Sequence, residues 1–159
     1  FDTHQSLSNA VATELPVLIN AWIDAGGLDV TAWAQEGESS SAPKVQISER
    51  QIDWSSMSGL DIFNLVRACA SASQGAWFRF GQEYLQLLEC TPLEGDNFHL
   101  EPGMIVHLGA PKGILLASTD GLLRLDVISS PGGIFSGLRF AERYRLQAGQ
   151  KFESCQAIQ

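Results

Sequence analysis

Three arginines near the C-terminal end are the residues whose type and spacing best suit ligand binding. Arg139 and Arg143 stand four positions apart, so a helix would place both on one face, and Arg145 follows closely. Planar guanidinium groups bind phosphate through paired hydrogen bonds, which makes these residues a candidate contact surface for an anionic acceptor or partner. The alternative is a solvated helix face above an aromatic anchor, because Phe140 and Tyr144 share a second face.

The other reactive side chains have no catalytic spacing. His4, His99 and His107 are far apart, and none stands near a cysteine or carboxylate at the spacing of a metal site. His107 lies in a strand-like segment, where we expect it to face solvent. Asp53 precedes a helix start, where a carboxylate typically accepts bonds from backbone N–H groups. We therefore assign no catalytic, cofactor-binding or metal-binding residue in this chain.

Composition and charge limit the partners of this chain. It is 45% hydrophobic and 18% charged, which is typical of globular proteins, and its formal net charge of −8 repels nucleic acid and anionic lipid on average. Residues 122–151 differ, because they hold five basic residues and two acidic ones. An anionic partner would meet this stretch.

Apolar runs and cysteines indicate the compartment. The apolar runs are too short to cross a bilayer, so no membrane partner is expected. The three cysteines match neither a disulfide framework nor a zinc pattern, which favours a reducing, cytoplasmic location. The first residue is Phe rather than Met, and we expect the chain to be a piece of a longer protein.

A long amphipathic helix is predicted over residues 2–25. Asp2 or Thr3 can cap its start, and apolar residues then recur at helical spacing. Pro16 removes one backbone donor and predicts a kink or a second helix start just before it. The apolar stripe consists of Leu7, Val11, Leu15, Leu18 and Trp22.

A polar connector and a second helix follow. Residues 28–41 are polar and small, which predicts an exposed connector. Ser58 and Asp61 have capping-box spacing and predict a helix start, and the small residues from 71 to 75 predict its end. Its apolar face is predicted to contain Leu60, Phe63, Val66 and Ala70, widened by Ile62, Leu65 and Cys69.

The rest of the chain reads as short strands. Asp120-Gly121 between two apolar runs is the strongest hairpin signal, and Gly81-Gln82 suits another tight turn. Residues 130–133 are predicted to be a loop, and residues 138–146 a short helix or an edge strand. The expected strands cover residues 76–80, 83–89, 104–108, 114–119 and 122–128. Strands at this spacing predict a small closed barrel, hence an α+β, mainly β fold.

Several segments, in chain order, resemble the methionyl-tRNA formyltransferase family. They are DTHQSL (2–7), SAPKV (41–45), QIDWSSMSGLDIFNLVRACASASQGAWF (51–78), EPGMIV (101–106), GILLASTDGLLRLDVI (113–128) and GQKF (149–152). The resemblance implies that residues 1–27 are the terminal helix of a truncated catalytic domain and that 28–50 are a linker. Residues 51–153 would form a C-terminal oligonucleotide-binding-like (OB-like) barrel with a leading helix.

The resemblance also implies a parent enzyme that transfers a formyl group from 10-formyltetrahydrofolate to an amine. The family's catalytic Asn, His and Asp would lie upstream of Phe1, and this chain would position an acceptor or partner for that domain. The anionic acceptor would be a tRNA, a nucleotide sugar or a carrier-bound substrate. The alternatives are a non-catalytic interaction module, part of a formyl-folate hydrolase, and an oligonucleotide-binding protein by barrel type alone.

Overall fold

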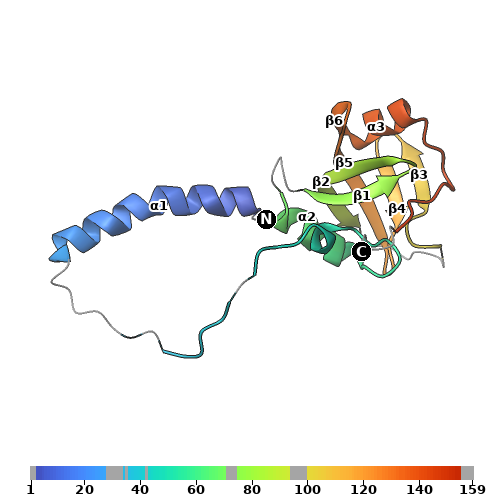
Figure 1. The fold of residues 1–159 in the computed structure, drawn as a ribbon. Helices are drawn as coiled ribbons and strands as arrows, with labels where there is room; N and C mark the ends of the chain where they lie inside the picture. Colours follow the sequence, from blue (N-terminus) through green and yellow to red (C-terminus); the bar gives the residue numbers. More distant parts are fainter. Residues whose placement is uncertain are drawn as a thin grey trace.

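A computed structural model of the chain describes residues 3–27, 34, 36–41, 43–70, 75–93 and 100–154. Figure 1 shows a mainly β body, with a long helix and a connector extending from it. No described helix has the length and apolar character needed to cross a membrane. In chain order the elements are α1 (His4–Asp24), η2 (Ser48–Arg50), α2 (Gly59–Ala68), β1 (Ala76–Phe80), β2 (Glu83–Leu93), β3 (Ile105–Gly109), β4 (Gly113–Ala117), β5 (Leu122–Ser130), β6 (Gly133–Ser136) and α3 (Gly137–Tyr144).

The first predicted helix is present as α1, and a capping box fixes its start. The Thr3 hydroxyl accepts a bond from the Ser6 backbone N–H at 3.1 Å, and Ser6 Oγ accepts one from the Thr3 backbone N–H at 2.9 Å. The helix continues through Pro16, so the expected second start is wrong. Proline removes a single backbone bond, and the turns on both sides remain bonded.

The second predicted helix is present as α2, and most of its predicted apolar face packs on the core, with Leu60 as the exception. Ser58 Oγ accepts from the Asp61 backbone N–H at 3.0 Å, and Asp61 accepts from the Ser58 backbone N–H at 3.1 Å. The buried residues are Gly59, Ile62 and Val66, whereas Leu60 is 57% exposed. The helix therefore lies on β2 through Ile62 and Val66, as the apolar spacing predicted, whereas Leu60 is turned to solvent.

The strands form one antiparallel sheet in the order β1-β2-β5-β4-β3, with β6 paired to β5. The two predicted hairpins are present, and their turns are Gly81-Gln82 and residues 118–121. β2 extends to Leu93, beyond its predicted end, with irregular pairing to β5 around Glu89. The predicted α+β, mainly β class is confirmed.

The segment after α3 connects the two edges of the sheet. Lys151 pairs with Met104, just before β3, and Glu153 pairs with Arg79 of β1. Phe152 between them is fully buried and contacts Trp54 and Phe78 through their rings. These isolated pairings join the β1 edge and the β3 edge of the sheet to the segment 151–153. Such an arrangement is compatible with the predicted OB-like barrel.

Residues 130–136 differ from the prediction. The predicted loop over 130–133 is a tight turn, and β6 begins within it at Gly133. β6 is short and mostly exposed, so it lacks the alternating pattern that marks a half-buried strand. Immediately after it, residues 137–144 form a helix rather than an edge strand.

Candidate functional site: the arginine-bearing face of α3

Residues 137–144 form the helix α3, and Arg139 and Arg143 lie on one face of it, as predicted for a helix in this segment. Arg139 and Arg143 are exposed, while Phe140 is fully buried and stacks on Tyr144 with a centroid separation of 4.3 Å. Arg145 follows in the left-handed conformation, with a φ of 51°. One side of this short helix anchors it in the core, and the other presents guanidinium groups to solvent.

Gly137 explains how closely α3 approaches the sheet. An added Cβ at this glycine would lie 2.2 Å from the backbone oxygen of Leu125, which is far inside any real contact distance. The first turn of the helix is therefore pressed against β5, and only a residue without a side chain fits there. This contact fixes the position of the arginines that follow.

The three arginines have different surroundings. Arg139 Nη1 lies 3.2 Å from Glu142 Oε2, in an exposed ion pair within the helix. The guanidinium carbon of Arg143 instead lies 5.4 Å from the centre of the Phe135 ring, on β6. Arg143 forms no ion pair with a described carboxylate within 4 Å. Arg143 is therefore held by an aromatic ring, not by an opposite charge.

A hydroxyl network lies beside Arg143. Tyr144 Oη donates to Glu83 Oε2 at 2.6 Å. The pKa of Tyr144 is raised, first by burial and then by the bond to Glu83, and Ser130 and Arg143 act in the opposite direction. Tyr144 therefore stays neutral at physiological pH and serves as a hydrogen-bonding group.

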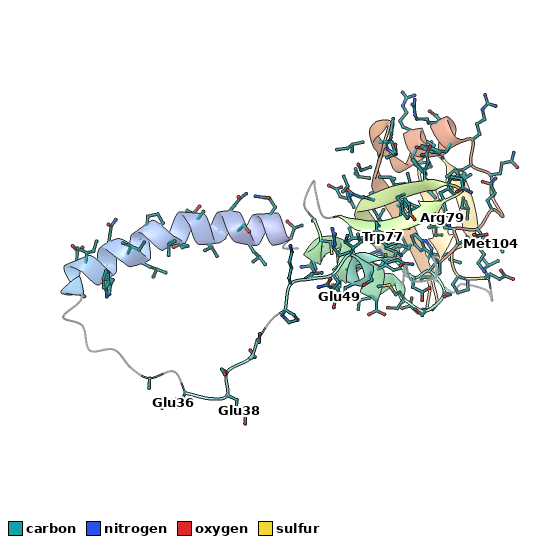
Figure 2. The ribbon with its side chains drawn as sticks, in the orientation of Figure 1. Glu36, Glu38, Glu49, Trp77, Arg79 and Met104 are labelled. Carbon is teal, nitrogen blue, oxygen red and sulfur yellow. The ribbon has the colours of Figure 1, made fainter. Side chains whose placement is uncertain are left out.

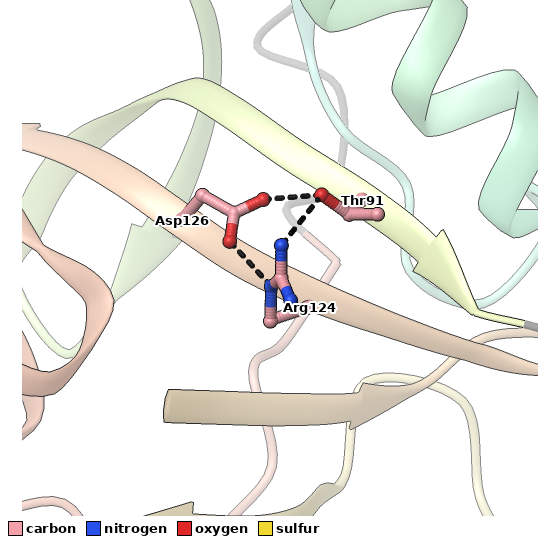
Figure 3. Close-up of polar contacts among 3 residues, drawn as sticks. All are labelled: Thr91, Arg124 and Asp126. Atoms are coloured by element: carbon pink, nitrogen blue, oxygen red, sulfur yellow. Dashed lines mark hydrogen bonds and ion pairs between the residues drawn. The ribbon is translucent and has the colours of Figure 1, made fainter. Parts of the chain in front are cut away.

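A second polar cluster, on strands β2 and β5, was not predicted from the sequence (Figure 3). Arg124 Nε lies 2.5 Å from Asp126 Oδ1, Thr91 Oγ1 lies 2.5 Å from Asp126 Oδ2, and Arg124 Nη2 lies 3.2 Å from Thr91 Oγ1. Arg124 and Thr91 face each other across β5 and β2. Both Asp126 oxygens are used inside this triangle, which indicates a structural tie between the strands.

A cleft of about 230 Å³ lies next to this triangle, between α2 and the irregular part of β2. Its wall includes the thiol of Cys90, which is 6% exposed. Burial, and to a lesser extent Asp126, raises the pKa of Cys90 to about 12. The thiol therefore remains protonated and does not act as a nucleophile. The cleft is lined by Thr3, Phe63, Val66, Arg67, Ala70, Leu88, Glu89, Cys90, Thr91 and Asp126.

Two further hollows flank Trp77, which Figure 2 labels near Arg79 on the body. They measure about 250 and 270 Å³. The Trp77 indole N–H donates to the Ile47 carbonyl at 2.8 Å, and its ring meets Tyr84 edge to face. The ring thus anchors the incoming connector to β1, which gives Trp77 a structural role.

The histidines do not form a site in the described part of the chain. His4 begins α1, but its side chain lies outside the described residues, as does the whole of His99. His107 on β3 is half-buried, and its Nε2 is buried without a hydrogen-bond partner among the described residues, so the expectation that it faces solvent is wrong. Among the described residues, no group of His, Cys, Asp and Glu could hold a metal ion.

Asp53 has the structural role that the sequence indicated, although the donors differ. Its Oδ1 accepts from the backbone N–H of Ser55 at 3.0 Å and from the Ser55 hydroxyl at 2.6 Å, and its Oδ2 accepts from Ser56. The hydroxyl of Ser154, followed by those of Ser55 and Ser56, lowers the pKa of Asp53 well below its usual range. The ionised carboxylate orders the turn before α2.

Comparison with known proteins identifies the C-terminal body. Residues 44–144 match the family described as formyl transferase, C-terminal domain. A methionyl-tRNA formyltransferase from Sulfurihydrogenibium sp. (strain YO3AOP1) is 32% identical over 113 residues, which are 70% of this chain and 35% of that protein. One from Streptomyces griseus is 36% identical over 78 residues, covering 49% of this chain and 23% of that protein.

Solved structures show the same fold at lower identity. A multiply substituted variant of HypX from Aquifex aeolicus matches with a TM-score of 0.65 and 18% identity, over 90% of this chain and 26% of HypX. HypX in complex with tetrahydrofolic acid matches with a TM-score of 0.60 and 16% identity, over 89% and 25%. This chain therefore spans about a third or less of these relatives.

Proposed function

The chain belongs to the formyl transferase C-terminal domain family, and from this premise we propose that it holds an anionic formyl acceptor for an upstream catalytic domain. The observation that carries the proposal is the arginine face of α3 in a chain whose overall charge is −8. A local cationic surface on an acidic protein attracts a phosphate-bearing acceptor to one place. Because the curated relatives are named methionyl-tRNA formyltransferases, a charged tRNA is the first acceptor to test.

The hollows found among the described residues offer no suitable place for the formyl donor. The three hollows described above measure about 230 to 270 Å³, below the usual range for a drug-sized ligand, and none combines ionisable groups in a reactive arrangement. We therefore assign 10-formyltetrahydrofolate to the upstream domain and derive no step of the transfer from these residues. The amine of the acceptor would be delivered to that domain.

The α1 helix supports an upstream partner. Its large apolar residues are all 45% to 65% exposed, an unusual amount of apolar surface for a helix of a finished globular domain. We infer that this face packs on the catalytic domain and that α1 is the terminal helix of that domain. The connector after it, on which Figure 2 labels Glu36 and Glu38, would then link the two domains.

The test measures formyl transfer from 10-formyltetrahydrofolate to methionyl-tRNA by the longer parent protein. Replacing Arg139, Arg143 and Arg145 with Gln should raise KM for the tRNA by about tenfold or more, because phosphate contacts are lost, and should change kcat little. The purified 159-residue chain alone should transfer no formyl group. A matched control replaces Lys44 and Lys112, which are exposed lysines outside the α3 face, and should leave KM unchanged.

Four results would contradict the proposal. Transfer by the isolated chain would place the chemistry within these residues. An unchanged KM for every tested acceptor, including a nucleotide sugar and a carrier-bound amine, would remove the role of the arginines. Release of formate without any amine acceptor would instead favour a formyl-folate hydrolase, and a parent protein without either activity would favour an interaction module.

A further inference from the structure

We propose that Arg143, held between Phe135 and Gly132, is the residue of the α3 face that binds a phosphate group. This inference rests on the proposed function for its biological setting, because it names the contact point of the anionic acceptor. Its physical basis is separate: one of the three arginines is held in place without an opposing charge, and a glycine gives it room.

The guanidinium group of Arg143 contacts the Phe135 ring and lies close to Gly132. Its central carbon lies 5.4 Å from the centre of the Phe135 ring. An added Cβ at Gly132 would lie 3.1 Å from Nη2, 3.3 Å from Nε and 3.5 Å from the central carbon. A side chain at position 132 would therefore press on the guanidinium, which would have to shift by a few tenths of an ångström. An aromatic contact of this kind orients the group, and its N–H donors are not paired with any carboxylate of the described residues.

The turn that carries Gly132 is itself ordered. Ser130 Oγ accepts from the Gly132 backbone N–H at 3.2 Å and lies 3.4 Å from the Gly133 carbonyl oxygen. The turn joins β5 to β6, so Gly132 and Phe135 belong to one short hairpin. Arg143 thus rests on a surface whose position is fixed by strand pairing. Such preorganisation lowers the entropy lost when an anion binds.

The other two arginines are less suited to this role. Arg139 is committed to Glu142, so an incoming anion would have to compete with a carboxylate. Arg145 lies at the exposed end of the helix, and no aromatic contact or ion pair to a described residue holds it. Glu83 is a second acidic group of this region, and one of its oxygens accepts the bond from Tyr144. A phosphate is the ligand class that fits, since its oxygens match two adjacent guanidinium donors.

The test uses the 159-residue chain and inorganic pyrophosphate as the probe, followed by amide chemical shifts in NMR. Pyrophosphate should shift the amides of Gly132 and Gly133 in a saturable, salt-sensitive way. Gly132→Ala should weaken binding by about tenfold, because the new Cβ displaces the flexible guanidinium while all charges remain. Arg143→Lys should weaken it similarly, since lysine keeps the charge but loses the planar fork. Lys112→Gln, which removes an exposed cation outside the α3 face, is the matched control and should change it less than threefold.

Folding is checked for each variant through its thermal midpoint. The clash at position 132 is with the end of a long side chain, so Gly132→Ala should leave the midpoint unchanged. If it does not, Phe135→Leu provides the second variant, because it removes the ring beneath Arg143 and should weaken binding as well. Equal affinities for wild type, Gly132→Ala and Arg143→Lys would overturn the inference, as would shifts confined to other parts of the chain.

The inference and the proposed function can fail separately. Pyrophosphate binding at Arg143 in a parent protein without formyl transfer would uphold the phosphate contact and refute the acceptor role. Formyl transfer with a KM that depends on Arg139 and Arg145 but not on Arg143 would uphold the function and refute this contact.

Discussion

Helices α1 and α2 begin with the same local device but have opposite surroundings. Each starts with a capping box, made by Thr3 and Ser6 in α1 and by Ser58 and Asp61 in α2. α2 is half as long, yet it buries Ile62 and Val66 completely or almost so against the body. The described residues of α1 between 5 and 24 are all exposed.

The comparison separates what starts a helix from what stabilises it. A cap satisfies backbone donors and fixes where the helix begins, while most helical stability in proteins comes from packing of the apolar face. α2 has both contributions within this chain, and α1 has only the first. The apolar face of α1 is therefore the part of the molecule that most clearly requires another surface, in agreement with the proposed upstream domain.

The largest expected difference between the two helices concerns their apolar residues. Ile62→Ala should lower the free energy of unfolding of the body by about 2–5 kcal/mol, because it leaves a cavity in the core. Leu18→Ala in α1 should change it by less than about 0.5 kcal/mol, because Leu18 is 65% exposed. Urea unfolding monitored by tryptophan fluorescence measures both. A cost at Leu18 equal to that at Ile62 would mean that α1 packs on the body.

The caps should differ by a smaller amount. Ser58→Ala should cost about 1 kcal/mol in the same unfolding measurement, because α2 unfolds together with the sheet. Thr3→Ala should leave that transition unchanged and only reduce the helical signal in circular dichroism, because α1 frays independently. If Thr3→Ala shifted the midpoint of the body as much as Ser58→Ala does, the two helices would be one cooperative unit and the comparison would fail.

Local signals in the sequence predicted most of the fold. The cap at Ser58 and the Asp120-Gly121 turn depend on neighbouring residues, and both lie where their patterns indicated. The exposure of Leu60 on α2 could not be predicted, since it depends on which side of the helix the sheet covers. β6 was missed because a short, exposed edge strand has almost no alternation of apolar and polar residues.

The candidate site was predicted only in part. The arginines of α3 follow from helical spacing, but what distinguishes Arg143 from Arg139 does not. That difference comes from Phe135 and Gly132, which belong to the hairpin before the helix. The bonds joining Thr91, Arg124 and Asp126 likewise require the register between β2 and β5. Both features depend on contacts between separate elements, which the sequence alone does not specify.

Hydrogen exchange at the amides of α1 tests the central claim most directly. It is measured once in the 159-residue chain and once in the longer parent protein. The account predicts fast exchange along α1 in the isolated chain, protection close to that of α2 in the parent, and equal protection of α2 in both. Strong protection of α1 in the isolated chain, or its continued fast exchange in the parent, would contradict the claim that this helix completes an upstream domain.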